Sequence, residues 1–449
     1  MRTPRVGGAA LGLAAAATVM LASAPAASAL GEDDASLRQR VAELEARLAE
    51  LKQTSTHHWL TEQRAADIRA LVQDVLADAD TRASLLQGGG TAGWDNGFFL
   101  ASADGNFRLN LKGLVQVRYV FNHQDDDAED SSRGGFESRR TKLIFTGHVV
   151  DPSWIYKVQG NFSSMGGGFV LEDAFIGKAL GNGWTFLAGQ VKVPMQREFL
   201  VENYDQLPVE RSLVDAEFNA GRTQGAAIDY RGDWLHFTFG YTDGHTATGG
   251  TNAPALAYDT EYSLTARAEV LLAGSWDQFA DLTSWKGEEF GFMLGGGIHY
   301  QDGEYGTAAD EIEALQWTVD ASLEFGGANL LAYVVGRHLD STTIDLDQYG
   351  FVIQGGFFVT DDVELFARYE WGDDDISSED LSIVTVGFNK YFSRQQLRWS
   401  CDVGYGLNEV SATWGDGLLG TGGAGAGWRT DASDNDGQIV FRTQLQLKF

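Results

Sequence analysis

One segment, Met195–Arg222, concentrates charge within an otherwise regular part of the chain. Its charged residues are Arg197, Glu198, Glu202, Asp205, Glu210, Arg211, Asp215, Glu217 and Arg222. Fixed charges of both signs in one place can attract, repel and sort ions and polar solutes. Hydrophobic residues such as Phe199 and Leu213 lie among these charges. A segment of this length without a strand pattern is usually functional in a compact domain. We therefore expect this segment to fold into the interior of the domain; the alternative is an exposed loop that helps subunits to associate.

A second set of charged residues alternates with hydrophobic residues along extended stretches. In residues 106–122, Lys112 and Arg118 fall on one face and Val115 and Val117 on the other, because successive side chains of a strand point to opposite sides. The same alternation places further basic residues on the polar face, among them Arg140, Lys192, Arg368 and Arg442. This face is predicted to be mixed to mildly basic, while most of the acidic excess falls in the connections. Acidic mouths would concentrate cations and a basic constriction would favour anions, so the ion preference stays open.

The composition excludes several classes of protein. Lys and Arg number 33 against 63 Asp and Glu, giving a net charge of −30, which argues against a nucleic-acid partner. Cys401 is the single cysteine, so an internal disulfide framework is excluded. The chain has no G-x-x-x-x-G-K-[ST] loop, H-E-x-x-H helix or G-x-S-x-G elbow. We predict no catalysis, no cofactor and no metal site.

Sixteen stretches with a period of two account for most of the chain after residue 105. They are 106–122, 136–150, 154–164, 169–180, 184–194, 223–231, 234–243, 261–273, 290–302, 314–326, 328–338, 348–359, 363–372, 381–392, 397–409 and 437–449. Many are longer than the five or six residues usual for strands of soluble proteins. Short turns alternate with longer acidic connections, which is typical of bacterial outer-membrane barrels. Two connections break this rule: 274–289 is long where a short turn is due, and 165–168 is short.

These features predict an all-β transmembrane β-barrel of about 16 antiparallel strands. A soluble β-sandwich or propeller is the alternative, since glycine-rich chains with even strand spacing also form those. The polar face carries too many charges for a packed core. Tyr and Trp recur near strand ends, as at Trp154 and Trp371, and the chain ends on Phe449 at the tip of a strand. We therefore prefer the barrel.

The N-terminal region is predicted to have three parts. Residues 1–29 have the basic start, apolar stretch and A-x-A site of a signal peptide, the alternative being an uncleaved anchor. Residues 30–87 form an α-helical arm with a short heptad seam from Leu37 to Leu51. This arm is either a single amphipathic helix or a coiled coil in the periplasm that joins subunits. Residues 88–105 would be a linker, and 106–449 the barrel.

Several separated motifs together resemble one family of porins. They are Phe136–Gly147 (FESRRTKLIFTG), Leu171–Ile176 (LEDAFI), Gly189–Pro194 (GQVKVP), Glu210-Arg211-Ser212, and Gly221-Arg222 with Gly225. In order and spacing they are similar to the phosphate-selective porin O and P family. This resemblance implies a trimer of sixteen-stranded channels that pass small anions through a narrowed lumen. It places Arg139, Arg140 and Lys192 on basic motif positions and Arg211 and Arg222 in loop motifs.

The function predicted from these observations is passive diffusion of small ions and solutes through an outer-membrane porin, with a possible preference for anions such as phosphate. Segment 195–222 would constrict the lumen. The pore-lining and constriction residues predicted are Lys112, Arg118, Arg139, Arg140, Lys192, Arg197, Glu198, Glu210, Arg211, Arg222 and Arg368. The predicted partners are outer-membrane lipid, two further copies in a homotrimer, and peptidoglycan. The alternative is a structural barrel whose arm tethers the membrane to the cell wall.

Overall fold

The computed structural model describes residues 42–43, 45–47, 90–124, 131–162, 164, 166–245, 260–303, 312–418, 424–431 and 437–449. The chain divides into two compact units, Met1–Arg82 and Ala83–Phe449. In the first unit the five described residues are helical. The predicted signal peptide and almost all of the predicted helical arm lie outside the described residues.

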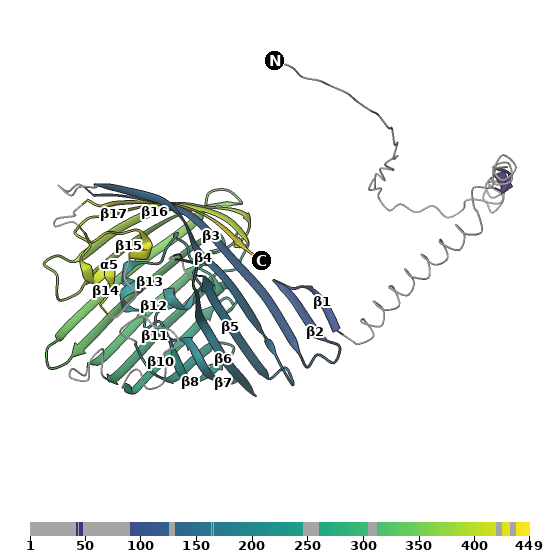
Figure 1. Ribbon diagram of the computed structural model, residues 1–449, viewed down its shortest axis with the longest axis horizontal. Coiled ribbons are helices and arrows are strands. Elements are labelled where there is room, and N and C mark those ends of the chain that lie inside the picture. Colours follow the sequence, from purple (N-terminus) through teal and green to yellow (C-terminus); the bar gives the residue numbers. More distant parts are fainter. Residues whose placement is uncertain are drawn as a thin grey trace, which may run out of the picture. The chain divides into compact units, whose positions relative to one another are not determined.

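The second unit is built from antiparallel strands (Figure 1). The first half comprises β1 (Gly90–Trp94), β2 (Phe98–Ser102), β3 (Arg108–His123), β4 (Ser132–His148), β5 (Trp154–Phe162), β6 (Phe169–Gly181), β7 (Trp184–Lys192), β8 (Arg222–Arg231) and β9 (Leu235–Thr242). The second half comprises β10 (Thr260–Ala273), β11 (Gly291–Gly303), β12 (Glu313–Glu324), β13 (Ala328–Asp340), β14 (Asp345–Phe358), β15 (Val363–Asp373), β16 (Leu381–Ser393), β17 (Leu397–Gly406) and β18 (Ile439–Lys448).

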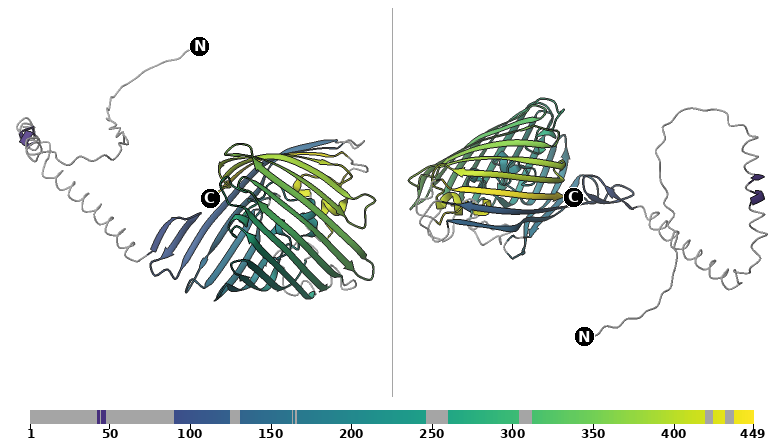
Figure 2. Two further views of the ribbon diagram at one scale, coloured as in Figure 1. Left: turned by 180° about the vertical axis from the view of Figure 1, so that it is seen from behind. Right: turned by 90° about the horizontal axis from the view of Figure 1, so that it is seen from above.

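Strands β3 to β18 close into a barrel. Each pairs with the next in the sequence, and β18 returns to pair with β3 from Ile439 opposite His123 to Lys448 opposite Leu114. The two further views show the closed wall from behind and from above (Figure 2). Each of the sixteen predicted stretches overlaps one of these strands, so the predicted sixteen-stranded barrel is confirmed.

Among the described residues, no helix combines the length and the apolar character needed to span a membrane.

The barrel is polar inside and apolar outside. In β12, Gln316, Thr318 and Asp320 are buried, whereas Trp317 and Val319 are 40% and 56% exposed. A soluble sandwich or propeller would bury its apolar face, so this inverted pattern excludes that alternative. It matches a barrel whose outer face meets lipid and whose inner face is polar.

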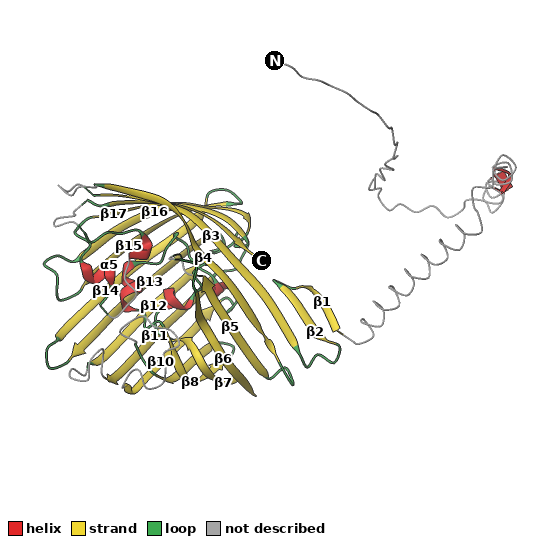
Figure 3. Cartoon of the chain, viewed as in Figure 1, coloured by secondary structure: helices red, strands yellow, loops and turns green. Residues whose placement is uncertain are grey.

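Three connections fill the interior. They are 193–221 with α3 (Arg197–Leu200) and α4 (Leu213–Phe218), 274–290 with η1 (Gln278–Ala280), and the described parts of 407–438 with α5 (Ala412–Asp416) and η2 (Ala424–Ala426). Their helical turns lie among the strands in Figure 3. All three contribute side chains that are almost fully buried, such as Phe218, Leu282 and Trp414. Connection 274–290 is therefore long because it folds inward, and the strand count around it is right.

One apolar cluster joins these three connections to the wall. It includes Leu207, Leu213 and Phe218 from 193–221, with Leu282 from 274–290 and Trp414 from 407–438. The wall contributes Leu331, Tyr333, Val335, Val352, Phe366, Leu381, Ile383 and Val440. The ring centroids of Phe218 and Trp414 lie 6.0 Å apart. Burial of apolar surface is thus the main stabilising contribution that holds the connections inside the barrel.

The range 88–105, expected to be a linker, contains a β-hairpin instead. Strands β1 and β2 pair from Gly90 opposite Ser102 to Trp94 opposite Phe98. A two-fold pattern of so few residues is hard to recognise in the sequence, and Gly90, Gly93 and Gly97 resemble linker composition. Pairing of β2 with β3 stabilises this short hairpin, because a two-stranded hairpin alone is marginal in water.

Candidate functional site

Two β-bulges turn adjacent charged residues toward the interior. In the β3–β4 pairing, Gln116 lies opposite Arg140 and Val117 opposite Ser138, so Arg139 is an extra residue. In the β5–β6 pairing, the same irregularity leaves Glu172 without an opposite residue, next to Asp173. A bulge re-aims side chains that strict alternation would place on opposite faces. Both members of each charged pair consequently bond to inward-facing groups.

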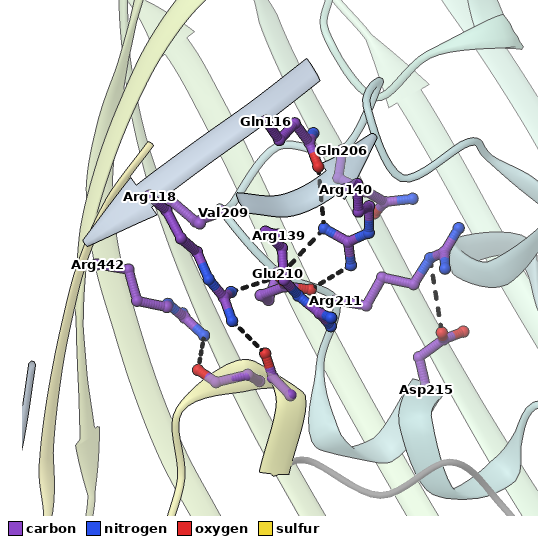
Figure 4. Close-up of polar contacts among 12 residues, drawn as sticks. Gln116, Arg118, Arg139, Arg140, Gln206, Val209, Glu210, Arg211, Asp215 and Arg442 are labelled. Carbon is purple, nitrogen blue, oxygen red and sulfur yellow. Dashed lines mark hydrogen bonds and ion pairs between the residues drawn. The ribbon is translucent and has the colours of Figure 1, made fainter. Parts of the chain in front are cut away.

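The first bulge builds an arginine cluster around Glu210 of segment 193–221 (Figure 4). The Glu210 carboxylate accepts from Arg118 Nη1 at 2.5 Å, Arg139 Nε at 2.7 Å and Arg140 Nη2 at 2.6 Å. Arg118 also pairs with Glu137. Burial acts to raise the pKa of Glu210, but the charges of Arg139, Arg140 and Arg118 outweigh it and hold that pKa well below its usual range. Glu210 is therefore a stable anion that brings the three guanidinium groups together.

The backbone around Glu210 is fixed to the opposite wall. Arg368 of β15 donates from Nη1 to the Glu210 carbonyl oxygen at 2.9 Å. The Val209 N–H donates to Asp402 of β17 at 2.9 Å, and the Leu213 N–H donates to Glu370 of β15 at 2.5 Å. Segment 193–221 thus bridges β3 and β4 to β15 and β17 through buried hydrogen bonds.

The second bulge builds a lysine cluster next along the wall, from β4 to β8. Its bases are Lys142, Lys157, Lys192 and Arg222, and its carboxylates are Glu172, Asp173 and Glu202. Lys142 pairs with Glu172 and Lys157 with Asp173, each at 2.7 Å. Burial acts to raise the pKa of Glu202, but the charges of Lys192 and Lys157 hold it well below its usual range. Glu202 is therefore a stable anion among these bases.

In both clusters the most exposed base pairs with a carboxylate that is more deeply buried. The Arg139 side chain is 23% exposed against 5% for Glu210, and that of Lys157 is 20% exposed against 3% for Asp173. In each cluster the bases exceed the carboxylates by one. A solute near either cluster therefore meets a small excess of positive charge.

The other predicted residues mostly hold segment 193–221 in place. Arg197 donates to the Phe279 carbonyl of connection 274–290. Glu198 is fully buried and accepts from the Ser212 N–H and hydroxyl and from the Tyr333 hydroxyl. Arg211 donates to the carbonyl oxygens of Glu198, Phe199 and Val201. These contacts fasten the segment to itself and to the wall.

Lys192, Arg222 and Lys112 differ in their surroundings. Lys192 donates to the carbonyl oxygens of Phe199 and Leu200 at 3.0 and 3.2 Å. Arg222 pairs with Asp173 at 2.8 Å, so both residues belong to the lysine cluster. Lys112 lies apart beside the turn of the β1–β2 hairpin, where its stem would block a side chain at Gly97.

A cavity of about 360 Å³ adjoins the lysine cluster. Lys192, Arg197, Arg267, Asp229, His236, Glu269 and Trp276 are among the residues that line it. The two ring nitrogens of His236 lie 2.8 Å from carboxylate oxygens of Asp229 and Glu269. The sequence did not predict this cavity, because its wall includes η1 of connection 274–290. No motif in the sequence indicates that this connection folds inward. The apolar residues of that connection were the available signal.

Solved structures share the fold at low sequence identity. An anion-selective porin from Comamonas acidovorans matches with a TM-score of 0.54 and 14% identity over 76% of this chain and 99% of its own. The outer-membrane channel DcaP of Acinetobacter baumannii matches with a TM-score of 0.51 and 11% identity over 76% and 98%. These likenesses and the inverted polarity of the wall define the fold class: an outer-membrane β-barrel.

The family follows from the sequence comparison. The family model of the phosphate-selective porin O and P matches residues 110–404, and the chain belongs to this family, as the motifs predicted. An uncharacterized protein of Aquifex aeolicus (strain VF5) is 26% identical over 251 residues, which are 49% of this chain and 60% of that protein.

Proposed function

We propose that this porin passes small inorganic anions with a modest preference over cations, past the arginine and lysine clusters. The observation that carries this proposal is that bases outnumber carboxylates by one in both clusters, and that the most exposed bases, Arg139 and Lys157, pair with the more deeply buried Glu210 and Asp173. Basic groups at a narrow point favour anions, since they act at short range in a partly desolvated passage. Segment 193–221 provides the constriction.

A strong selectivity for phosphate is not part of this proposal. Glu210 and Glu137 already pair the three arginines, and three carboxylates pair the four bases of the lysine cluster. A transit anion therefore meets an excess of about one charge at each cluster rather than three or four unpaired ones. We expect chloride and other small anions to pass with a permeability ratio of a few fold over potassium.

The oligomeric state is a further proposal. We propose a homotrimer, on the basis of the family and of a solved trimer form of OmpT from Vibrio cholerae, an outer-membrane protein with the same fold at a TM-score of 0.50. Conductance steps in groups of three would support this assembly. Single steps from protein that stays monomeric after cross-linking would argue against it.

The test is the reversal potential of the purified protein in a planar bilayer across a KCl gradient. The wild type should be anion-preferring, and Arg139→Ala should lower that preference because it removes the most exposed guanidinium of the cluster. The matched control is Lys390→Gln, a rim residue paired with Asp362, which should change nothing. A cation-preferring wild type overturns the anion proposal, and an unchanged reversal potential in Arg139→Ala removes the arginine cluster from the pore wall.

The apolar cluster favours a second candidate function. It joins all three inward connections across the interior, as expected of a plugged barrel with a structural role at the cell wall. Folded protein without conductance would support this structural role over the proposed diffusion of ions through the barrel.

A further inference from the structure

The β1–β2 hairpin continues the barrel wall beyond the seam where the barrel closes. Strand β2 pairs with Arg108–Leu111 of β3, and β18 pairs with Leu114–His123 on the same edge of β3. The hairpin is therefore an extension of the same sheet, directly after the end of β18. Figures 1 and 2 show it projecting from the wall beside the first residues of β3.

The two faces of the hairpin differ in polarity. Opposite residues of neighbouring strands share a face, so Phe98 and Leu100 lie on the same side as Leu111 and Leu109 of β3. That side leads without a break to Val117, 43% exposed on the outer wall. On the other side, Arg108 lies over the ring of Phe99 and pairs with Asp95 at 2.8 Å. The apolar face is thus the one continuous with the outer surface of the barrel.

The apolar face also fills a gap in a ring of exposed aromatic residues. Each of the seven turns at the short-turn rim has one at or beside it: Trp154, Trp184, Trp234, Phe290, Phe325, Phe357 and Phe392. Such rings mark the membrane–water interface of a barrel. The seam between β18 and β3 has no turn, and there the hairpin supplies Trp94 and Phe98, 49% and 54% exposed.

We propose that the outer face of the β1–β2 hairpin is inserted in the lipid interface at the short-turn rim, with phospholipid as its partner. The continuity of this face with the lipid-facing wall and with the aromatic ring favours lipid over a second protein. A groove of about 300 Å³ beside it, lined by Leu100, Phe107, Leu109 and Tyr156 among others, is suited to part of an acyl chain. The hairpin is then a membrane-bound element of the chain.

Single-cysteine labelling tests this proposal, since Cys401 is the one cysteine of the chain. In a Cys401→Ser background, Leu100→Cys and Ala101→Cys place a fluorescent label on opposite faces of β2. The full-length protein is reconstituted in vesicles of phosphatidylethanolamine and phosphatidylglycerol. Quenching is then measured with doxyl-labelled phosphatidylcholine from the lipid and with iodide from water, and folding is checked by heat-dependent gel mobility.

The label at 100 should be quenched about threefold more by doxyl lipid than the label at 101, with the reverse order for iodide. Equal quenching of the two labels by iodide overturns the proposal. A label at 100 that is shielded from both quenchers and transfers energy between protomers also overturns it, because a second copy then covers this face. The pair Phe98→Cys and Phe99→Cys repeats the comparison at a neighbouring position if one of the first variants does not fold.

Discussion

The two sides of segment 193–221 contrast in what they touch. Toward β13–β16 the segment has a dry side: Leu207, Leu213 and Phe218 are at most 1% exposed within the apolar cluster. The ion pairs on this side, Glu217 with Arg337 and Glu198 with Arg368, are fully buried. Toward β3–β8 it is charged, with Glu202 and Glu210 bonded to bases of the wall. The dry side gains free energy from apolar burial, whereas the charged side gains little net, because ion pairs of this kind lose about as much in desolvation as they gain. One side therefore anchors the segment, and the other presents charge to the solute.

The largest expected effect comes from breaking the dry side. Phe218→Ala should lower the free energy of unfolding by about 3–5 kcal/mol, because it leaves a cavity beside Trp414. Conductance should rise as segment 193–221 loses its anchor. Urea unfolding and single-channel recording measure the two effects. Phe392→Ala, an exposed rim aromatic, is the control and should leave conductance unchanged; the same conductance in Phe218→Ala would show that the charged side alone holds the segment.

An intermediate effect is expected from the charged side. Glu210→Gln keeps the size of the side chain but removes the charge that compensates Arg118, Arg139 and Arg140. The permeability ratio of anion to cation should rise roughly two- to fivefold, as for an interaction of about 0.5–1 kcal/mol. Reversal potentials in a KCl gradient measure it. Adding Arg139→Ala should return the ratio toward the wild-type value, and a fall in anion preference in Glu210→Gln would contradict the arrangement.

The smallest expected effect is a change in the pH dependence of stability, at Asp281 in connection 274–290. Burial, followed by the nearby Asp205 carboxylate, raises the pKa of Asp281 to about 7. The folded protein then binds more protons than the unfolded chain between about pH 4 and 7, so this group makes stability fall as pH rises through that window. Asp281→Asn should remove that part of the pH dependence and stabilise the protein at pH 8 by about 1 kcal/mol. Urea titrations at pH 5 and 8 check it; an equal change at both pH values would refute the assignment.

The barrel was predictable from the sequence because its signal is repeated along every strand. Alternation such as that of Gln316, Trp317 and Thr318 encodes both the element and its inner face. For connection 274–290, the one sign of its inward fold in the sequence was its unusual length. The residues that it contacts, such as Tyr391 and Leu331, are far away in the chain. Contacts of that kind depend on closure of the barrel and have no local pattern.

The candidate site was predictable only in part, and the bulges explain why. Alternation placed Arg140 and Glu172 on the inner face, but it sent Arg139 and Asp173 outward; only the family resemblance named Arg139. A bulge depends on how two strands pair, which neither strand encodes by itself. Two adjacent charges within a strand of alternating polarity, as in Arg139-Arg140 and Glu172-Asp173, are the sequence signal that could have revealed it.

The edge of β3 has a consequence for how the barrel closes. Since β2 occupies this edge up to Leu111, β18 cannot slip toward the start of β3 without colliding with the hairpin. Gly113 exchanges both backbone hydrogen bonds with Phe449, at 2.6 and 3.0 Å, and its missing side chain leaves room for the Phe449 ring. The β1–β2 hairpin thus acts as an end stop for β18, and it helps to fix the register at which the barrel closes.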